Sequence, residues 1–268
     1  MAWTFSALGG GQEIGANSYL LNLSGTRILL DAGLHPKKYG QESLPDYDRI
    51  DYELEAIFIS HAHLDHVGSL PLANRRHPQA PIFTTIPTKD VALRMLHNTV
   101  TVMNIFRKEK GLLEYPFFDR EDLWPLESEI IGVEYRPKRI PSGKGNNLYS
   151  EWVHLRRGVQ VHFIPAGHVL GAAGLLLRQG KRFLYYTGDI SLQPQTLIPG
   201  AVLPEGKIDT LILECTYGND PVYHSRNRQG EIESFARETT SILSAGGCVL
   251  IPAFALGKTQ EVLCILYQ

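Results

Sequence analysis

His61-Ala62-His63-Leu64-Asp65-His66 directly follows the apolar run Ala56–Ser60 and brings four potential metal ligands into six residues. A short continuous apolar run is typical of a strand buried on both faces. His61 and His63 are two residues apart, so on extended backbone their side chains point the same way and can share one ion. Asp65 and His66 lie on the turn into the next predicted helix and would face a neighbouring ion.

The donor types in this stretch indicate the kind of metal site. Imidazole and carboxylate groups without thiolates favour zinc in an open catalytic site over a closed structural one. A chance cluster of solvated histidines is the alternative, and it would be enough to explain an isolated H-x-H pair. The full H-x-H-x-D-H pattern at the exit of a buried strand favours the metal site.

The composition is typical of a soluble globular protein. Of the 268 residues, 43% are apolar and 20% are charged, which excludes disorder over most of the chain and suits one large domain or two small ones. No apolar run approaches the roughly 20 residues that a membrane span needs. The first residues lack the basic and apolar regions of a signal peptide. We therefore expect no membrane partner and, by default, a cytoplasmic location.

Charge and cysteine content narrow the possible functions further. A formal net charge of -2 gives no overall positive field for nucleic acid, so a polyanion would have to bind through a local patch or a metal. The three cysteines, Cys215, Cys248 and Cys264, form no C-x-x-C pair. They suit a reducing compartment and argue against a disulfide framework or a cysteine-rich zinc finger.

Alternating and helical hydrophobic patterns predict a layered α/β protein. The first three predicted strands of the chain are separated by glycine-containing turns, which indicates a meander of hairpins. The predicted strands are Thr4–Leu8, Ser18–Leu23, Thr26–Leu30, Ala56–Ser60, Glu129–Tyr135, Val159–Pro165, Gly174–Arg178, Arg182–Thr187, Asp209–Glu214 and Cys248–Pro252. The predicted helices are Val67–Arg76, Thr88–Lys110, a short one opening at Asp119, Glu231–Ser244 and one from Leu256.

Five further stretches occur in a fixed order around the histidine motif and carry a family resemblance. Three of them, with His61–His66, resemble the signatures of a metallo-β-lactamase-fold hydrolase, and two resemble segments of its β-CASP nucleases. The match runs from Gly9 to the end of the chain. The first three are Leu29-Leu30-Asp31-Ala32-Gly33, Ala166-Gly167-His168-Val169-Leu170-Gly171-Ala172 and Tyr186-Thr187-Gly188-Asp189. The two β-CASP stretches are Glu214-Cys215-Thr216-Tyr217-Gly218 and Ile251–Lys258.

The resemblance implies a site with two zinc ions and assigns its residues. The expected metal ligands are His61, His63 and His168 for the first zinc, Asp65 and His66 for the second, and Asp189 as a bridge. Asp31 would orient the ligand loops. The carboxylates expected to serve catalysis are Asp31, Asp65 and Glu214. Such a pair of ions can lower the pKa of a bridging water and hold the oxygens of a phosphodiester.

The resemblance also implies the domain organisation. Residues 1–213 would form a four-layer αββα sandwich, and residues 214–268 would open a β-CASP α/β cap. In the family the chain returns to the hydrolase domain with two more histidines, which have no place here. We therefore expect a truncated chain in which Glu214 lacks its histidine partner, the second zinc lacks one ligand, and one sheet has an exposed edge or apolar face.

The function implied by the resemblance is zinc-dependent cleavage of RNA phosphodiesters. The motifs resemble the RNA-processing branch, so we expect an endoribonuclease, with or without exonuclease activity, that acts on single-stranded RNA. Its partners would be a second copy of the chain or an RNA-processing complex. Two alternatives stay open. One is a thioester or lactone hydrolase of the same fold, and the other is a non-catalytic truncated scaffold that is inactive alone.

A few other residues have two possible interpretations. The loop 223–228, with His224 and Arg226, could contact phosphate or could be solvated. The basic stretch Arg136–Arg139, with Lys144, Arg156 and Arg157, could follow an RNA backbone but is more typical of a charged surface. Gly9–Gly15 lacks the following helix of a dinucleotide-binding loop and predicts a tight turn near the metal loops.

Overall fold

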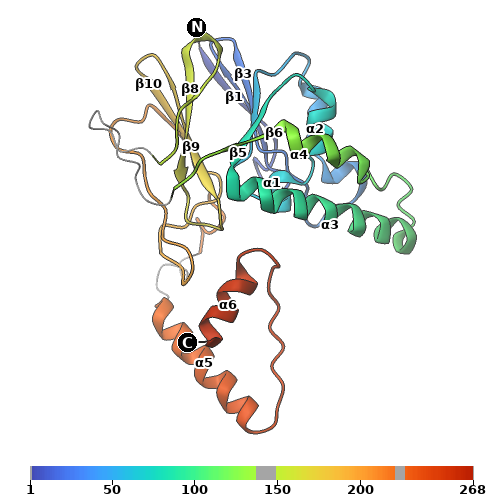
Figure 1. The fold of residues 1–268 in the computed structure, drawn as a ribbon, viewed down its shortest axis with the longest axis vertical. Helices are drawn as coiled ribbons and strands as arrows, with labels where there is room; N and C mark the ends of the chain where they lie inside the picture. Colours follow the sequence, from blue (N-terminus) through green and yellow to red (C-terminus); the bar gives the residue numbers. More distant parts are fainter. Residues whose placement is uncertain (1, 137–148, 221–226, 268) are drawn as a thin grey trace.

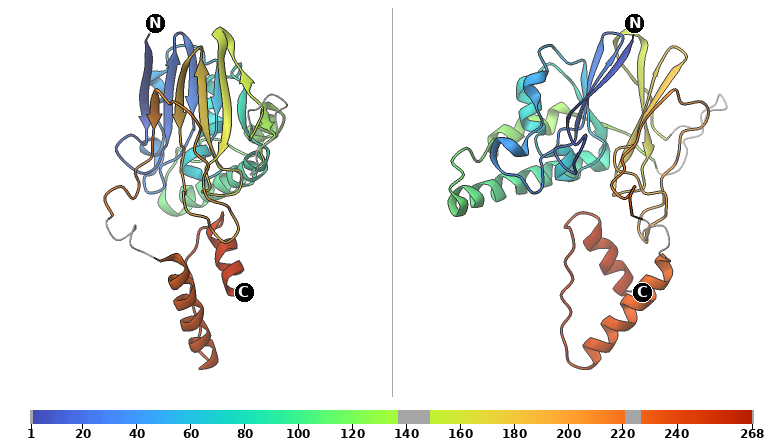
Figure 2. Two further views of the ribbon diagram at one scale, coloured as in Figure 1. Left: turned by 90° about the vertical axis from the view of Figure 1, so that its left-hand side faces the viewer. Right: turned by 180° about the vertical axis from the view of Figure 1, so that it is seen from behind.

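A computed structural model describes residues 2–136, 149–220 and 227–267 of the chain (Figure 1). Within these residues the structure forms two β-sheets that pack face to face, with helices on the outer face of the first sheet (Figures 1 and 2). Helices α5 and α6 lie apart from the sheets, below them in Figure 1.

The first sheet combines the predicted meander with parallel strands. Its strand order is β1-β2-β3-β4-β5-β6, and β1 to β3 are antiparallel while β3 to β6 are parallel. The hairpin meander and the buried strand after it are therefore confirmed. The strands are β1 (Trp3–Gly9), β2 (Ser18–Leu23), β3 (Thr26–Leu30), β4 (Ala56–Phe58), β5 (Ile82–Thr85) and β6 (Ile130–Val133).

The second sheet has the order β11-β10-β9-β8-β7, in which β10 and β11 are parallel and the other neighbours are antiparallel. Its strands are β7 (Val153–His154), β8 (Val159–Pro165), β9 (Ala173–Gln179), β10 (Arg182–Tyr186) and β11 (Thr210–Ile212). Because β9 lies antiparallel between them, β8 and β10 run in the same direction and end at the same edge.

The core between the sheets is apolar and tightly packed. Phe58 of β4 is fully buried, and its ring centroid lies 5.2 Å from that of Phe83 and 6.1 Å from that of Phe163 in the opposite sheet. Alternate residues of β2 and β3 and of β8 and β9 fill the rest of this layer, as expected for strands whose side chains alternate between two faces.

Helices cover the outer face of the first sheet and build a second core there. They are α1 (Leu64–Val67), α2 (Leu70–Arg76), α3 (Ile86–Lys110) and α4 (Trp124–Glu129), joined by the short 3-10 turns Gly40–Ser43, Tyr47–Arg49 and Glu121–Leu123. The Thr85 hydroxyl accepts a hydrogen bond from the Thr88 N–H at the start of α3. Gly111, at φ 67°, ends the same helix in the left-handed conformation.

The outer face of the second sheet has a different cover. Among the described residues loops, and no helix, pack on it, with Trp152, Val202 and Ile208 against the buried Leu176 and Tyr185. The loop residues between β10 and β11 include Pro194, Pro199 and Pro204, which disfavour a helix. The layered α/β fold class is confirmed. The second helical layer of the predicted αββα sandwich is not formed by the described residues.

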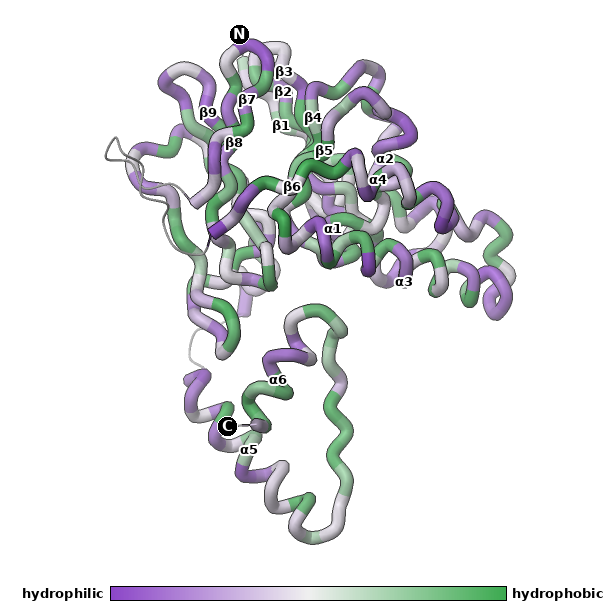
Figure 3. Tube along the Cα trace, in the orientation of Figure 1, coloured by the Kyte–Doolittle hydropathy of each residue, from purple (hydrophilic) through white to green (hydrophobic). Residues whose placement is uncertain are grey.

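The C-terminal region contains the predicted helices but not the predicted strand. α5 (Arg228–Ser244) and α6 (Lys258–Tyr267) are joined by a long connection that is largely apolar (Figure 3). The strand predicted over Cys248–Pro252 is wrong: no described strand pairs with this segment, and Leu250 is 93% exposed. An extended segment needs a neighbouring strand to satisfy its backbone groups, and an apolar pattern cannot report whether one exists.

No helix within the described ranges is long and apolar enough to cross a membrane.

The packing between the sheets generates a stability prediction. Phe58→Ala should lower the free energy of unfolding by about 3–5 kcal/mol, because it leaves a cavity between two facing sheets. Denaturant unfolding followed by circular dichroism measures the change. The control is Leu113→Ala, whose side chain is 79% exposed and which should change the free energy of unfolding by under about 0.5 kcal/mol. Equal effects of the two substitutions would contradict the packing described here.

Candidate metal centre

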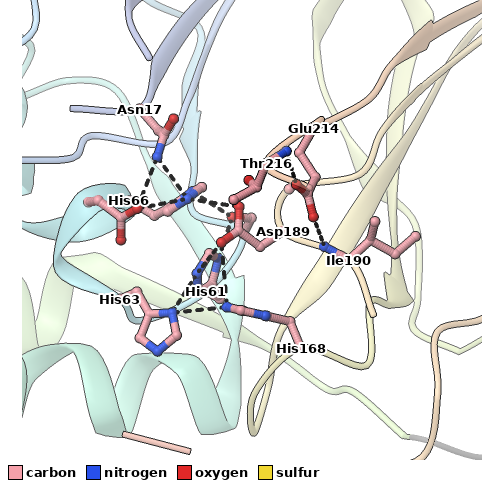
Figure 4. Close-up of polar contacts among 12 residues, drawn as sticks. Asn17, His61, His63, His66, His168, Asp189, Ile190, Glu214 and Thr216 are labelled. Atoms are coloured by element: carbon pink, nitrogen blue, oxygen red, sulfur yellow. Dashed lines mark hydrogen bonds and ion pairs between the residues drawn. The ribbon is translucent and has the colours of Figure 1, made fainter. Parts of the chain in front are cut away.

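The residues predicted as ligands follow strands of both sheets and converge at one edge of the sandwich (Figure 4). His61 and His63 lie in the loop between β4 and α1. His168 lies in the turn between β8 and β9, and Asp189 follows β10. Loops at the carboxyl ends of strands are common positions for functional residues, since the strands hold the loop ends rigidly.

The first group of donors consists of three histidines and one carboxylate. His63 Nδ1 lies 3.2 Å from His61 Nε2 and 3.0 Å from His168 Nε2. Asp189 Oδ2 lies 3.8 Å from His61 Nε2 and 3.4 Å from His168 Nε2. One ligand atom of each residue lies within 4.8 Å of all the others. We call this group the first cluster.

A second group of donors shares the same aspartate. His66 Nε2 lies 3.2 Å from Asp189 Oδ1 and 3.7 Å from Asp65 Oδ2. These three residues form the second cluster. Asp189 therefore presents Oδ2 to the first cluster and Oδ1 to the second, which is the arrangement expected of a carboxylate between two ions.

Protonation in the first cluster suits metal binding. Burial, together with the neighbouring histidines, holds the pKa of His61 well below its usual value. Burial also lowers the pKa of His63, and it lowers that of His168 to about 4. At neutral pH these imidazoles are uncharged and keep a nitrogen lone pair, which is the form that binds a metal.

The carboxylates complete the donor set. Burial alone would raise the pKa of Asp189, but its hydrogen bond to His66 and the charge of that ring lower it to about 2. Asp189 is therefore ionised at neutral pH. Several nitrogen lone pairs and an ionised carboxylate meet within a few ångströms, and a cation would relieve their mutual repulsion. The donor chemistry thus fits a metal centre.

Asp31 is fully buried and holds His66 from behind. Its Oδ2 lies 2.8 Å from His66 Nδ1 and accepts a 2.5 Å hydrogen bond from the Tyr186 hydroxyl. Its carboxylate also accepts hydrogen bonds from the Ser60 N–H and hydroxyl. With Nδ1 held by Asp31, Nε2 of His66 faces Asp189 and Asp65 of the second cluster. The orienting role of Asp31 stays a prediction.

Asn17 is a site residue that sequence reasoning missed. Its side-chain Nδ2 lies 2.9 Å from His66 Nε2 and 3.3 Å from Asp65 Oδ2 (Figure 4). The Tyr19 hydroxyl donates to Asn17 Oδ1 over 2.9 Å and fixes the amide. The available signal was the glycine-rich turn Gly9–Gly15 just before Asn17, which was predicted to lie near the metal loops but was not itself linked to a ligand.

Glu214 lies at the rim of the site, outside both clusters. Its Oε1 accepts a 3.3 Å hydrogen bond from the Ile190 N–H, and its Oε2 accepts a 3.0 Å bond from the Thr216 N–H (Figure 4). No described histidine is hydrogen-bonded to it. Since Ile190 follows Asp189 in the chain, Glu214 is linked to the shared aspartate through one peptide unit.

The remaining candidates add little to this site. His224 and Arg226 lie outside the described residues, and so do residues 137–139 and Lys144. Arg136, the described end of the basic stretch, forms an ion pair with Glu134 on the surface.

Comparison with known proteins places this geometry in a family. The model of the Metallo-beta-lactamase superfamily matches residues 11–240. The chain belongs to the metallo-beta-lactamase superfamily. The membership predicted from the motifs is thereby confirmed.

Curated relatives of this superfamily member cover nearly all of its length. Endoribonuclease YSH1 of Gibberella zeae is 33% identical over 265 residues, which is 98% of this chain and 29% of the relative. Cleavage and polyadenylation specificity factor subunit 3 of Dictyostelium discoideum is 34% identical over 97% of this chain and 31% of the relative. Endoribonuclease YSH1 of Saccharomyces cerevisiae is 32% identical, with shares of 98% and 32%. The chain therefore spans under a third of the length of each of these relatives.

The shared aspartate generates a prediction about metal content. Asp189→Ala removes an oxygen from both clusters and should reduce bound divalent metal at both. His168→Ala removes a ligand from the first cluster only, so metal at the second cluster should remain. Elemental analysis of protein dialysed against a defined free metal concentration measures both losses.

His154→Ala is the matched control for these variants, because His154 is exposed and lies away from both clusters. It should keep the metal content of the unaltered chain, and circular dichroism should show all variants folded. A folded Asp189→Ala variant with unchanged metal content would contradict the shared role.

Proposed function

We propose that this chain carries the catalytic metal centre of a zinc-dependent endoribonuclease. The observation that carries the proposal is the geometry of Asp189, whose two oxygens face two separate donor clusters. Paired metal sites of this kind are typical of enzymes that cleave phosphodiesters. The substrate class is inferred from relatives whose names are those of endoribonucleases and of a cleavage and polyadenylation factor subunit.

Two zinc ions are part of the proposal. The first would be held by His61, His63 and His168, the second by Asp65 and His66, with Asp189 between them. When bound, they would supply charge stabilisation for a phosphodiester and activate water for attack. Histidine and carboxylate donors without cysteine support zinc in an open site.

The chain's own residues would prepare this chemistry in distinct ways. Asp31 contacts His66 through Nδ1, which would keep Nε2 directed toward the second zinc. Asn17, fixed by Tyr19, keeps an amide donor beside the second cluster, where it could bind a phosphate oxygen. Glu214 is the proposed proton-transferring carboxylate at the rim, supported by its bond to the Ile190 N–H.

We also propose the predicted division of the chain. Residues 1–213 would form the hydrolase domain, and residues 214–268 would belong to a β-CASP cap. The end of the last described strand at Ile212 and the separate position of α5 and α6 support this boundary. The substrate would be single-stranded RNA, the partner an RNA-processing complex or a second copy of the chain, and the location the cytoplasm.

Cleavage of a single-stranded RNA oligonucleotide, labelled at one end and incubated with the zinc-loaded chain, tests the proposal. Zinc-dependent internal cleavage is expected, and His63→Ala or Asp189→Asn should reduce it to the background rate. His63→Ala removes a nitrogen donor from the first cluster, and Asp189→Asn replaces the charged carboxylate shared by both clusters with a neutral amide. His154→Ala should cleave at the rate of the unaltered chain.

The other outcomes identify the alternatives. Turnover of a thioester or lactone without RNA cleavage would favour a small-molecule hydrolase. Bound zinc with neither activity would favour a non-catalytic scaffold. RNA cleavage that persists in the folded Asp189→Asn variant would contradict the assignment of this site.

A further inference from the structure

The segment from Leu256 to Glu261, where the long connection enters α6, contacts the loops that carry the first cluster. The Leu256 side chain packs against Val169 and its neighbours in the loop of His168. The Leu256 carbonyl oxygen lies 3.5 Å from His63 Nε2. We call residues 256–261 the docking segment.

The contact with His63 has a consequence for its protonation. A carbonyl oxygen can only accept a hydrogen bond, so this contact favours the tautomer of His63 with the proton on Nε2. Nδ1 then keeps its lone pair, and this is the atom that faces His61 and His168. Outer hydrogen bonds of this kind fix the orientation and tautomer of a metal-binding histidine.

Glu261 anchors the other end of the docking segment. Its side chain is buried in α6, and its carboxylate accepts hydrogen bonds from the Thr196 N–H, at 2.5 Å, and the Leu197 N–H, at 3.1 Å. Arg228, the first residue of α5, forms an ion pair with it. Burial would raise the pKa of Glu261, but the Thr196 and Leu197 hydrogen bonds and the charge of Arg228 lower it.

The turn that Glu261 holds leads directly to His168. Gln195, next to Thr196, donates from Nε2 to the carbonyl of Gly167, at 2.9 Å, and to that of His168, at 2.7 Å. The backbone N–H of Gln195 closes the turn on the Ile198 carbonyl. The Glu261 carboxylate is therefore connected through one short turn to the backbone that presents His168 to the first cluster.

Close approach at Gly257 shows how tightly the docking segment fits. Gly257 has φ 84°, and a Cβ there would lie 2.8 Å from Val169 Cγ1. Any larger residue would be strained and would push the segment away from the His168 loop.

We propose that the docking segment positions the first metal cluster, with Glu261 holding the His168 loop and the Leu256 carbonyl holding His63. The packing of α6 against the site then stabilises metal binding by His61, His63 and His168. Metal binding stabilises this packing in turn, because coupling between two sites is reciprocal. Glu261 is in this view a positioning residue for the metal site. The inference rests on the proposed metal centre and adds a role that its ligand motifs do not contain.

Zinc titration against a chelating indicator tests the inference at the level of single sites. The binding step that disappears in His168→Ala identifies the first cluster. Glu261→Gln and Gly257→Ala should weaken zinc at that step by about 10-fold or more, the usual effect of losing an outer partner of a metal ligand. The step at the second cluster should stay unchanged, whereas general misfolding would weaken both.

The matched control is Glu238→Gln, because Glu238 is exposed on α5 and bonded to Ser234 of the same helix. It should bind zinc like the unaltered chain. Unchanged affinity in both test variants, or equal loss at both steps, would overturn this inference and leave the proposed function standing. An unaltered chain that takes up no zinc would overturn both.

Hydrogen exchange supplies a second test, which begins with the unaltered chain. The Thr196 and Leu197 N–H groups donate hydrogen bonds to Glu261. If zinc stabilises this contact, it should slow exchange of both amides in the unaltered chain, and the protection should vanish in Glu261→Gln. Mass spectrometry of a peptide spanning 192–200 measures it. Exchange that is indifferent to zinc in the unaltered chain would overturn the coupling.

Discussion

The buried carboxylate of Asp31 is the interaction on which the arrangement of the site depends. It follows β3 in the first sheet and accepts hydrogen bonds from Ser60 after β4 and from Tyr186 at the end of β10 in the second sheet. His66 also contacts it, through Nδ1. A buried charge is costly unless it is fully paired. The need to satisfy Asp31 therefore fixes both sheets and the His66 ring at the edge where the ligands converge.

Once this edge is fixed, the metal centre follows from short connections. β4, β8 and β10 end there, and the loop after each strand contributes residues to the two clusters. Asp189 lies between the donor groups because its loop continues the strand that carries Tyr186. A second buried carboxylate lies in the C-terminal region. Glu261 is also fully paired, since it accepts hydrogen bonds from two backbone amides and forms an ion pair with Arg228. Two buried carboxylates are thus connected to the site, Asp31 directly through His66 and Glu261 through the turn whose Gln195 bonds to the His168 backbone.

His61, His63, Asp65 and His66 could be predicted as candidate ligands because they lie in one short motif after an apolar strand, where local spacing carries the information. His168 and Asp189 were implied by the family resemblance of their motifs, and the structure places both beside that motif. Asn17 and Glu261 could not be predicted, because the contacts that link them to the site, with Asp65 and Thr196, join segments 48 or more residues apart and no local pattern marks them. The strand predicted at Cys248–Pro252 failed for a related reason, since pairing depends on a neighbour that an apolar run does not reveal. A helical layer was also expected on the outer face of the second sheet. Among the described residues, loops that include the proline-containing segment between β10 and β11 pack there instead.

The proposed metal centre has two ions, one on either side of Asp189. Anomalous diffraction from crystals of the zinc-loaded chain, recorded above and below the zinc absorption edge, tests it most directly. Two peaks are expected, one against His61, His63 and His168 and the other against Asp65 and His66, with Asp189 between them. A single peak, or peaks away from these side chains, would contradict it.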